Sequence, residues 1–265
     1  MFGLFAKKLP VDGEELEWLL ACFAWAAESL GGFEHFSAAP LVLADGKHFP
    51  SGGSSGHARA AELFAQVRGQ ARMPEPDWPA ELVAGESDRG SYLGGGLLLK
   101  HHGKAAPGGT FGRGETGYRI TYNPAELANP EALVATFAHE LSHYRMRGFR
   151  EMPPGGAALE EHATDLVAVA LGFGVPMANS AKDFSLWREA DSEGWQSRLR
   201  GYLSELALVT ALAIFCRLGG HDPAPAERSL KPYLRGPFRA ALGGLDRRFP
   251  DLRATIAAMD LSDWA

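Results

Sequence analysis

His139-Glu140-Leu141-Ser142-His143 is the stretch of this 265-residue chain that constrains the fold most, because its chemistry requires a helix. At 3.6 residues per turn, His139 and His143 lie one above the other on one helix face, close enough for both imidazoles to bind one ion. Glu140 then lies at the rim of that face, where it can hold a metal-bound water instead of the metal. The motif therefore supplies two candidate ligands and one candidate base.

The residues around the motif predict the helix that it needs. Asn129 is a strong N-cap residue, Pro130 suits the first helical position, and Glu131 places a negative charge where the helix dipole favours it. Apolar residues recur at helical spacing as far as Tyr144, and Gly148 suits a C-terminal stop. We therefore expect both histidines to lie on a helix.

A second helix is predicted over residues 157–172, after a loop at 148–156 that is rich in Pro and Gly and is a candidate lid. The segment is apolar nearly all round, which is typical of a buried helix. Glu161 and Asp165 stand four apart on one face, and buried carboxylates are costly unless a positive group compensates them. A zinc ion beside Glu161 and an imidazole N–H beside Asp165 would do so, and catalytic zinc usually has three protein ligands.

Together these patterns, His139-Glu140-Leu141-Ser142-His143 followed by Glu161-His162-Ala163-Thr164-Asp165, resemble the gluzincin metallopeptidases, the thermolysin-like group of zincins. The resemblance covers residues 117–172. It implies that His139, His143 and Glu161 bind one zinc ion per chain. It also implies that Asp165 orients a ligand histidine, His139, and that zinc-bound water hydrolyses a peptide or protein substrate with Glu140 as the general base.

Neighbouring residues offer alternatives to this ligand set. Glu160 could replace Glu161, but the residue four positions after Glu160 is Thr164, so no Asp would support it. Both acids could instead only complement the helix dipole. His162 lies about 100° around the helix from Glu161, which favours a partly exposed or hydrogen-bonded histidine over a ligand. The first motif could also be a helix with two surface histidines, since composition alone produces it with a chance of roughly two in a hundred.

A small sheet is predicted before the first of these helices. Residues 91–101 and 118–122 have strand character. In zincins the strand that precedes the metal helix is commonly the sheet edge, so the resemblance implies that residues 117–122 bind an extended peptide as an added strand. His101 and His102 are adjacent on a predicted strand and point to opposite faces, which disfavours a shared metal ion.

Helical segments are predicted on both sides of this core. The fold class is α+β: a zincin-like metallopeptidase core with a small mixed sheet and two active-site helices, plus N- and C-terminal helical parts. We expect a mainly helical part at 1–75, the catalytic core at 76–190, and a helical part at 191–265 that packs on the core and could bind a protein partner. The expected elements outside the core are helices at 13–30, 57–70, 195–218, 226–242 and 245–259, a strand at 41–44 and an irregular connector at 73–79.

Composition disfavours several classes of protein. The chain has 26 basic and 32 acidic residues, a net charge of −6 and a pI near 5.9, without the basic stripe that nucleic-acid binding demands. The longest apolar run, residues 206–215, is too short for a membrane span, and no secretory signal is recognisable. Cys22 and Cys216 lie among apolar neighbours, which favours buried thiols. We expect a cytoplasmic protein without nucleic-acid or membrane partners.

The residue that would stabilise an oxyanion stays open among Tyr122, Tyr144, Tyr202 and His221. Two other functions stay open as well. One is a catalytically silent zincin-like zinc protein that acts as a regulatory or ligand-binding module. Glu140 argues against it, because a structural zinc needs no base beside an open position. The other is a helical interaction protein that holds no metal.

Overall fold

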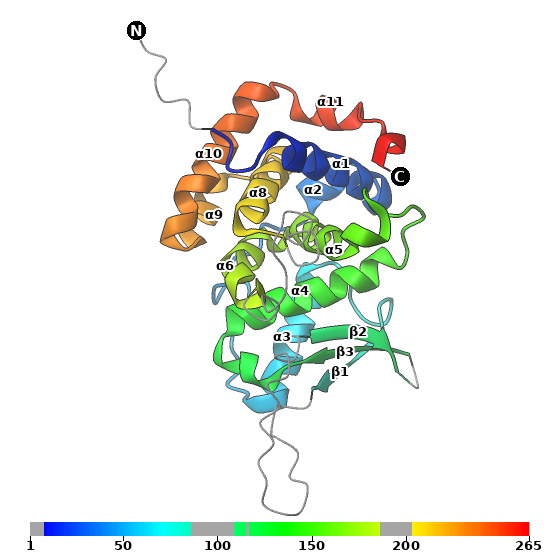
Figure 1. Ribbon diagram of the computed structural model, residues 1–265. Coiled ribbons are helices and arrows are strands. Elements are labelled where there is room, and N and C mark those ends of the chain that lie inside the picture. Colours follow the sequence, from blue (N-terminus) through cyan, green and yellow to red (C-terminus); the bar gives the residue numbers. More distant parts are fainter. Residues whose placement is uncertain (1–7, 86–108, 115–116, 186–202, 265) are drawn as a thin grey trace, which may run out of the picture.

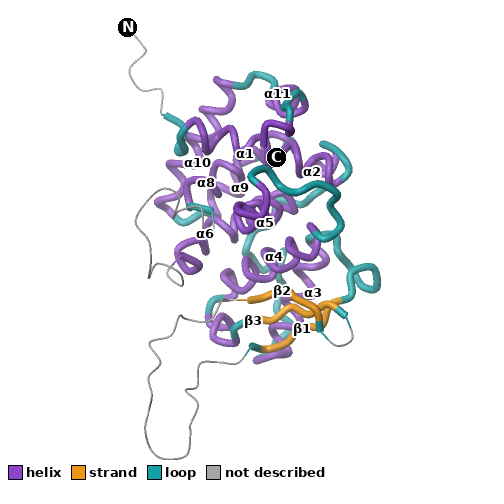
Figure 2. Tube along the Cα trace, turned by 45° about the vertical axis from the view of Figure 1, so that its right-hand side comes forward, coloured by secondary structure: helices purple, strands orange, loops and turns teal. Residues whose placement is uncertain are grey.

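A computed structural model describes residues 8–85, 109–114, 117–185 and 203–264 of the chain. Within these ranges the protein is mostly helical, with one small mixed sheet at one end of the molecule (Figure 1). The tube view from a second direction shows the same division between the sheet and the helices (Figure 2). The α+β fold class is therefore confirmed.

Three helices precede the sheet: α1 (Gly13–Leu30), α2 (Glu34–Ala38) and α3 (Gly56–Gln70). The Asp12 side chain caps the start of α1, and Gly31 ends it in the left-handed conformation, with φ 95°. The predicted helices at 13–30 and 57–70 are confirmed. The strand expected at 41–44 is wrong, because this segment is a loop whose Val42 N–H donates to the Gly172 carbonyl instead of to a neighbouring strand.

The sheet has three strands in the order β1 (Ala80–Ala84), β3 (Tyr118–Tyr122), β2 (Gly109–Arg113). β1 pairs in parallel with β3, and β2 pairs antiparallel with β3, Phe111 lying opposite Ile120. β3 is therefore the central strand, and the expectation that residues 117–122 form a sheet edge is wrong. The sequence pattern did not predict the edge strand β2, because this strand contains two glycines, a residue that is depleted in strands. The strand expected at 91–101, with His101 and His102, lies outside the described residues.

α4 (Pro130–Met146) carries the first motif and lies between the sheet and most of the helices, with α3 on the sheet side, as both views show (Figures 1 and 2). It follows a short 3₁₀ turn (Pro124–Ala128). The Asn129 side chain accepts the N–H of Ala132, and Pro130 occupies the first turn, so the predicted start of this helix is confirmed.

α5 (Glu160–Ala168) carries the second motif, after a 3₁₀ turn at Gly156–Leu159. Its regular part is shorter than the expected 157–172, because the chain widens into a π-helical turn at Val169–Phe173. Gly172 has φ 105° there, and a Cβ atom at this position would lie 2.0 Å from the Pro40 carbonyl oxygen. The positive φ and the close approach of the residue 40–42 loop therefore require a glycine at position 172.

The C-terminal half is helical, as expected, but with different boundaries. Its described helices are α6 (Gly174–Ser185), α8 (Glu205–Gly219), α9 (Pro223–Ser229), α10 (Pro232–Arg248) and α11 (Leu252–Ala257), followed by a 3₁₀ turn (Leu261–Trp264). α6 was not expected, but its Pro176 lies in the first turn, where a proline is tolerated. The break expected near residue 243 is wrong: α10 continues to Arg248, and Gly244 serves close packing, because a Cβ atom there would lie 2.6 Å from Leu9.

One hydrophobic cluster joins these elements. Its buried side chains run from Val11 to Ile256 and come from the residue ranges of all three predicted parts. Cys22 and Cys216 are buried free thiols, as expected. Each helix in the described ranges is too short or too polar to cross a lipid bilayer.

Candidate metal centre

Three side chains from two helices form a cluster between α4 and α5. The Nε2 atoms of His139 and His143 lie 3.1 Å apart. An Oε2 atom of Glu161 lies 3.4 Å from the first Nε2 atom and 3.7 Å from the second. In the part of the chain that the structure describes, this is the one group of three or more His, Cys, Asp or Glu residues whose ligand atoms all lie within 4.8 Å of one another. Such a group could hold a metal ion.

The separations of these atoms fit a small metal ion. Zinc binds imidazole nitrogen and carboxylate oxygen at about 2.0–2.2 Å, so the ligand atoms of a tetrahedral site lie about 3.3–3.6 Å apart. The observed separations, 3.1, 3.4 and 3.7 Å, bracket this range. Two imidazoles and one carboxylate suit zinc, and the same donor set also occurs with iron. The geometry therefore fits a metal ion but leaves open which metal it is.

Asp165 sets the orientation of the first histidine. It lies one turn after Glu161 on α5, is only 1% exposed, and accepts a hydrogen bond from Nδ1 of His139 at 2.9 Å. Its second oxygen accepts the backbone N–H of Leu203, which leads into α8, at 2.7 Å. With Nδ1 bonded in this way, Nε2 of His139 faces the cluster as a ligand atom.

The second histidine has a partner that sequence analysis missed. Nδ1 of His143 lies 3.4 Å from the hydroxyl oxygen of Thr164, which is fully buried on α5. In the sequence, Thr164 stands four residues after Glu160, where it disfavours Glu160 as a ligand, and no other role was predicted for it. Its position three residues after Glu161 was the available signal, because residues three apart share a helix face.

The cluster attracts positive charge. Burial disfavours a charged imidazolium, but hydrogen bonds to Asp165 and Glu161 outweigh burial and raise the pKa of His139 to about 10. Hydrogen bonds to His139 and His143 hold the pKa of the Glu161 carboxyl well below its usual range. A cation bound between His139, His143 and Glu161 would balance the same excess of negative charge.

Glu140 lies beside the cluster, under the edge strand of the sheet. The residue is 5% exposed, and burial raises the pKa of its carboxyl, while the nearby His139 and His143 and, least, a hydrogen bond from the backbone N–H of Phe111 in β2 act in the opposite direction. β2 passes directly over α4 at this point. A Cβ atom at Gly109 would lie 2.7 Å from Cγ2 of Thr136 and 3.1 Å from Cγ of Glu140. Among the strands that the structure describes, the sheet edge near the cluster therefore belongs to β2.

The alternatives on α5 lie apart from the cluster. Glu160 is exposed, and its carbonyl accepts the Thr164 hydroxyl. His162 was expected to be partly exposed or hydrogen-bonded; it is buried, so the first of these is wrong, and its ring lies edge-on to Trp18 of α1. The expectation that Glu161 is buried is also wrong, because its side chain is 42% exposed. It reaches the cluster from the solvent side, where a substrate could approach.

The oxyanion candidates that the structure describes have other partners. The Tyr122 hydroxyl lies 3.1 Å from Nδ1 of His57, and the Tyr144 hydroxyl donates to the Pro79 carbonyl at 3.2 Å. Nε2 of His221 lies 2.8 Å from the Phe36 carbonyl oxygen. Tyr202 lies outside the described residues. Each of the three described candidates therefore has its polar atom bonded to a partner outside the histidine–glutamate cluster.

The candidate lid at residues 148–156 is held against α1. The indole N–H of Trp18 donates to the Pro154 carbonyl at 2.9 Å, and that of Trp25 donates to the Glu151 carbonyl at 3.0 Å. Each bond joins residues more than 120 positions apart in the chain. These bonds oppose the opening and closing that a lid requires.

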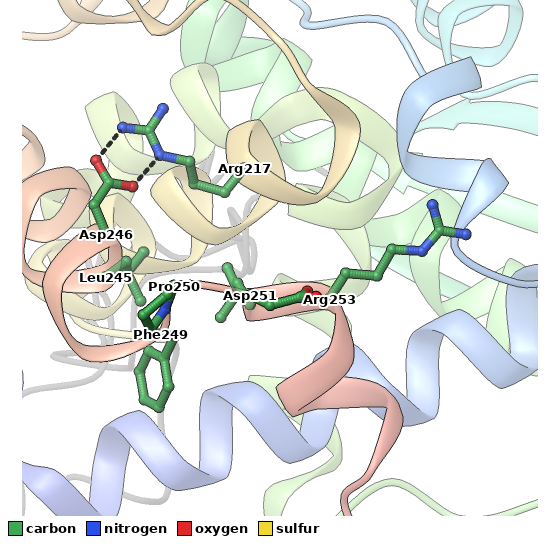
Figure 3. A pocket seen from close by; sticks show the side chains of 8 residues that line it. Arg217, Leu245, Asp246, Phe249, Pro250, Asp251 and Arg253 are labelled. Carbon is green, nitrogen blue, oxygen red and sulfur yellow. Dashed lines mark hydrogen bonds and ion pairs between the residues drawn. The ribbon is translucent and has the colours of Figure 1, made fainter.

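A surface pocket of about 310 Å³ lies elsewhere, where α8, α10 and α11 meet (Figure 3). Its charged groups include Arg217 and Asp246, which pair through two hydrogen bonds of 2.7 and 2.8 Å. None of the cluster residues lines this pocket. Because its charged pair is already satisfied, the pocket offers less chemistry than the histidine cluster.

No protein-family model, curated protein or solved structure matches this chain. Its function is therefore inferred from the chemistry of the cluster.

Proposed function

We propose that this protein is a zinc-dependent metallopeptidase of the gluzincin type. His139, His143 and Glu161 would hold one zinc ion, with Glu140 as the general base. One observation carries the proposal: two imidazole nitrogens and one carboxylate oxygen from separate helices converge within 3.1–3.7 Å. The neighbouring sheet and the pair of helices α4 and α5 are compatible with a zincin-like core.

The proposed reaction is hydrolysis of a peptide bond. When bound, the ion supplies Lewis acidity, which polarises the substrate carbonyl and acidifies water at the site. Glu140 accepts a proton from the attacking water and returns it to the leaving amine as the C–N bond breaks. Asp165 holds the proton on Nδ1 of His139 and so keeps Nε2 of that ring available as a ligand.

The edge strand β2 is the proposed surface for the substrate main chain. The N–H of Phe111 already faces Glu140, so the outward main-chain groups of this strand lie next to the cluster. An extended peptide that pairs with such an edge gains affinity from main-chain hydrogen bonds, with little dependence on its side chains. This replaces β3, whose two edges are both paired.

One observation favours the catalytically silent alternative. Glu140 is almost fully buried, and its carboxylate is hydrogen-bonded to the Phe111 N–H, which would compete with a water molecule for the same oxygen atoms. A silent zincin-like protein would bind zinc through the same ligands but would hydrolyse no peptide. Activity measurements on zinc-loaded protein separate the two functions.

Glu140→Gln tests the proposal. This isosteric change should keep one zinc per chain and lower kcat for peptide hydrolysis by about 10²–10⁴-fold, because an amide cannot accept the proton. Activity would be followed with a diverse set of quenched fluorescent peptides, with chelator and added zinc as controls. Glu160→Gln is the matched control, since Glu160 is exposed and outside the cluster. Full activity of the Glu140 variant would refute the assigned base. Zinc-loaded wild type that cleaves none of the peptides would support the silent alternative.

A further inference from the structure

The hydroxyl of Thr164 lies at the point where α5 meets His143 of α4. Its oxygen is 2.8 Å from the Glu160 carbonyl oxygen, 3.4 Å from Nδ1 of His143 and 3.4 Å from the sulfur of Met146. The residue is fully buried, so water cannot take the place of these partners.

The number of protons available decides the direction of these contacts. A threonine hydroxyl has one proton, and a carbonyl oxygen can only accept. The short contact with Glu160 therefore uses the proton, since a carbonyl oxygen is a better acceptor than the thioether sulfur of Met146. What Thr164 can offer His143 is a lone pair, so the ring nitrogen facing it has to donate.

This direction determines which nitrogen of His143 carries the proton. With the proton on Nδ1, the lone pair of the neutral ring lies on Nε2. Nε2 is the atom that lies 3.1 Å from Nε2 of His139 and 3.7 Å from the Glu161 carboxylate. The Glu160–Thr164–His143 chain thus directs a free lone pair into the cluster, as Asp165 does for His139.

We propose that Thr164 is a positioning residue for the metal ligand His143, acting by accepting its Nδ1–H. The proposal rests on the metal site proposed above. The two histidines then have partners of different strength, a carboxylate for His139 and a neutral hydroxyl for His143. Sequence spacing explains why both partners come from α5, because Thr164 and Asp165 are adjacent and follow Glu161 by three and four residues.

Thr164→Val tests this role because valine has nearly the same shape but no hydroxyl. Zinc would be titrated into the full-length, metal-free chain against a chromophoric chelator. We expect the zinc dissociation constant to rise about tenfold, the lower end of what loss of a ligand's hydrogen-bond partner costs. Thr164→Ser should bind zinc within a fewfold of wild type, because it restores the acceptor.

Thr210→Val is the matched control. Thr210 is also fully buried in a helix, and its hydroxyl donates to the carbonyl four residues earlier, that of Leu206, at 2.7 Å. It lies on α8 and is not a member of the cluster. Its replacement should change stability about as much as Thr164→Val but leave zinc affinity unchanged. Should the Thr164 valine variant not fold, as judged by circular dichroism, Thr164→Ala replaces it in the comparison with Thr164→Ser.

Two outcomes would overturn the role of Thr164. Either Thr164→Val binds zinc as tightly as wild type, or Thr164→Ser binds zinc as weakly as Thr164→Val. His143→Ala in the same titration separates this failure from failure of the metal site. If His143→Ala binds zinc as wild type does, the proposed ligand set is wrong. If it loses zinc while Thr164→Val keeps it, only the role of Thr164 is wrong.

Discussion

His139 donates a hydrogen bond from Nδ1 to Asp165 at 2.9 Å, and this bond joins residues 26 positions apart on two different helices. Both residues are almost fully buried, at 3% and 1% exposed. A charge-assisted bond in such surroundings is strong and holds the imidazole in one orientation. It therefore links the packing of α4 on α5 to the geometry of the proposed zinc ligands.

Asp165→Asn should weaken zinc binding about 10–100-fold. The amide removes the negative charge, and its NH₂ group must face either the Nδ1–H of His139 or the N–H of Leu203, both of which are donors. Competition with a chelator measures the effect. Asp246→Asn, which removes an exposed partner of Arg217, serves as the control and should leave zinc affinity unchanged. Equal affinities for the two variants would contradict the orienting role of Asp165.

Replacement of His143 or Glu161 should empty the metal site. Untagged wild-type protein should contain about one zinc per chain by elemental analysis, and His143→Ala or Glu161→Gln should contain much less, because catalytic zinc needs three protein ligands. Glu160→Gln should retain the metal, since its carboxylate lies outside the cluster. Iron in place of zinc would contradict the identity of the metal, and zinc retained by both ligand variants would contradict the site.

Gly109→Ala should damage both stability and activity. The added Cβ would meet the Thr121 carbonyl oxygen at 2.8 Å and Cγ2 of Thr136 at 2.7 Å, so β2 would have to shift away from α4 and Glu140. Overpacking of this kind costs about 1–3 kcal/mol, measurable by urea unfolding. Gly112→Ala on the same strand has no atom within 4 Å of the new Cβ and should be close to wild type. Similar behaviour of both variants would mean that β2 does not pack on α4 as described.

His35 should make the protein less stable in mild acid. Burial lowers the pKa of His35, and the nearby Arg145 and Arg72 lower it further, although its hydrogen bond to the Ala170 carbonyl acts in the opposite direction. The folded state therefore binds this proton less readily than the unfolded state. The stability that depends on neutral His35 is complete above the unfolded pKa of about 6.5 and is lost as the pH falls below it.

The contribution of His35 can be isolated with His35→Gln, which keeps an N–H donor for Ala170 but does not titrate. Urea unfolding of metal-free protein at about pH 7.5, 6.0 and 5.0 would compare the two proteins. The free energy of unfolding should fall more steeply with acid in wild type than in the variant. Parallel pH profiles for the two would show that His35 does not titrate in this way.

Local signals in the sequence were sufficient to predict α1, α3 and α4. Apolar periodicity predicted all three helices, and the Asn129 cap also marked the start of α4; both signals involve residues within a few positions of each other. The predicted helix boundaries were wrong where residues distant in the sequence pack against the helix. After α5 ends at Ala168, the Pro40 carbonyl lies against Gly172 in the following π-helical turn, and Leu9 lies against Gly244 inside α10, where the sequence suggested a break.

By itself, the sequence determined that one helix would present His139, Glu140 and His143 together, and that Glu161 and Asp165 would share a face of a second helix. Helical geometry sets both relationships within a few residues. Tertiary structure alone decided that these faces meet, that β2 and not β3 is the edge strand beside Glu140, and that Thr164 is the partner of His143. Such contacts depend on how helices and strands pack across long stretches of chain, and neither spacing nor periodicity encodes that packing.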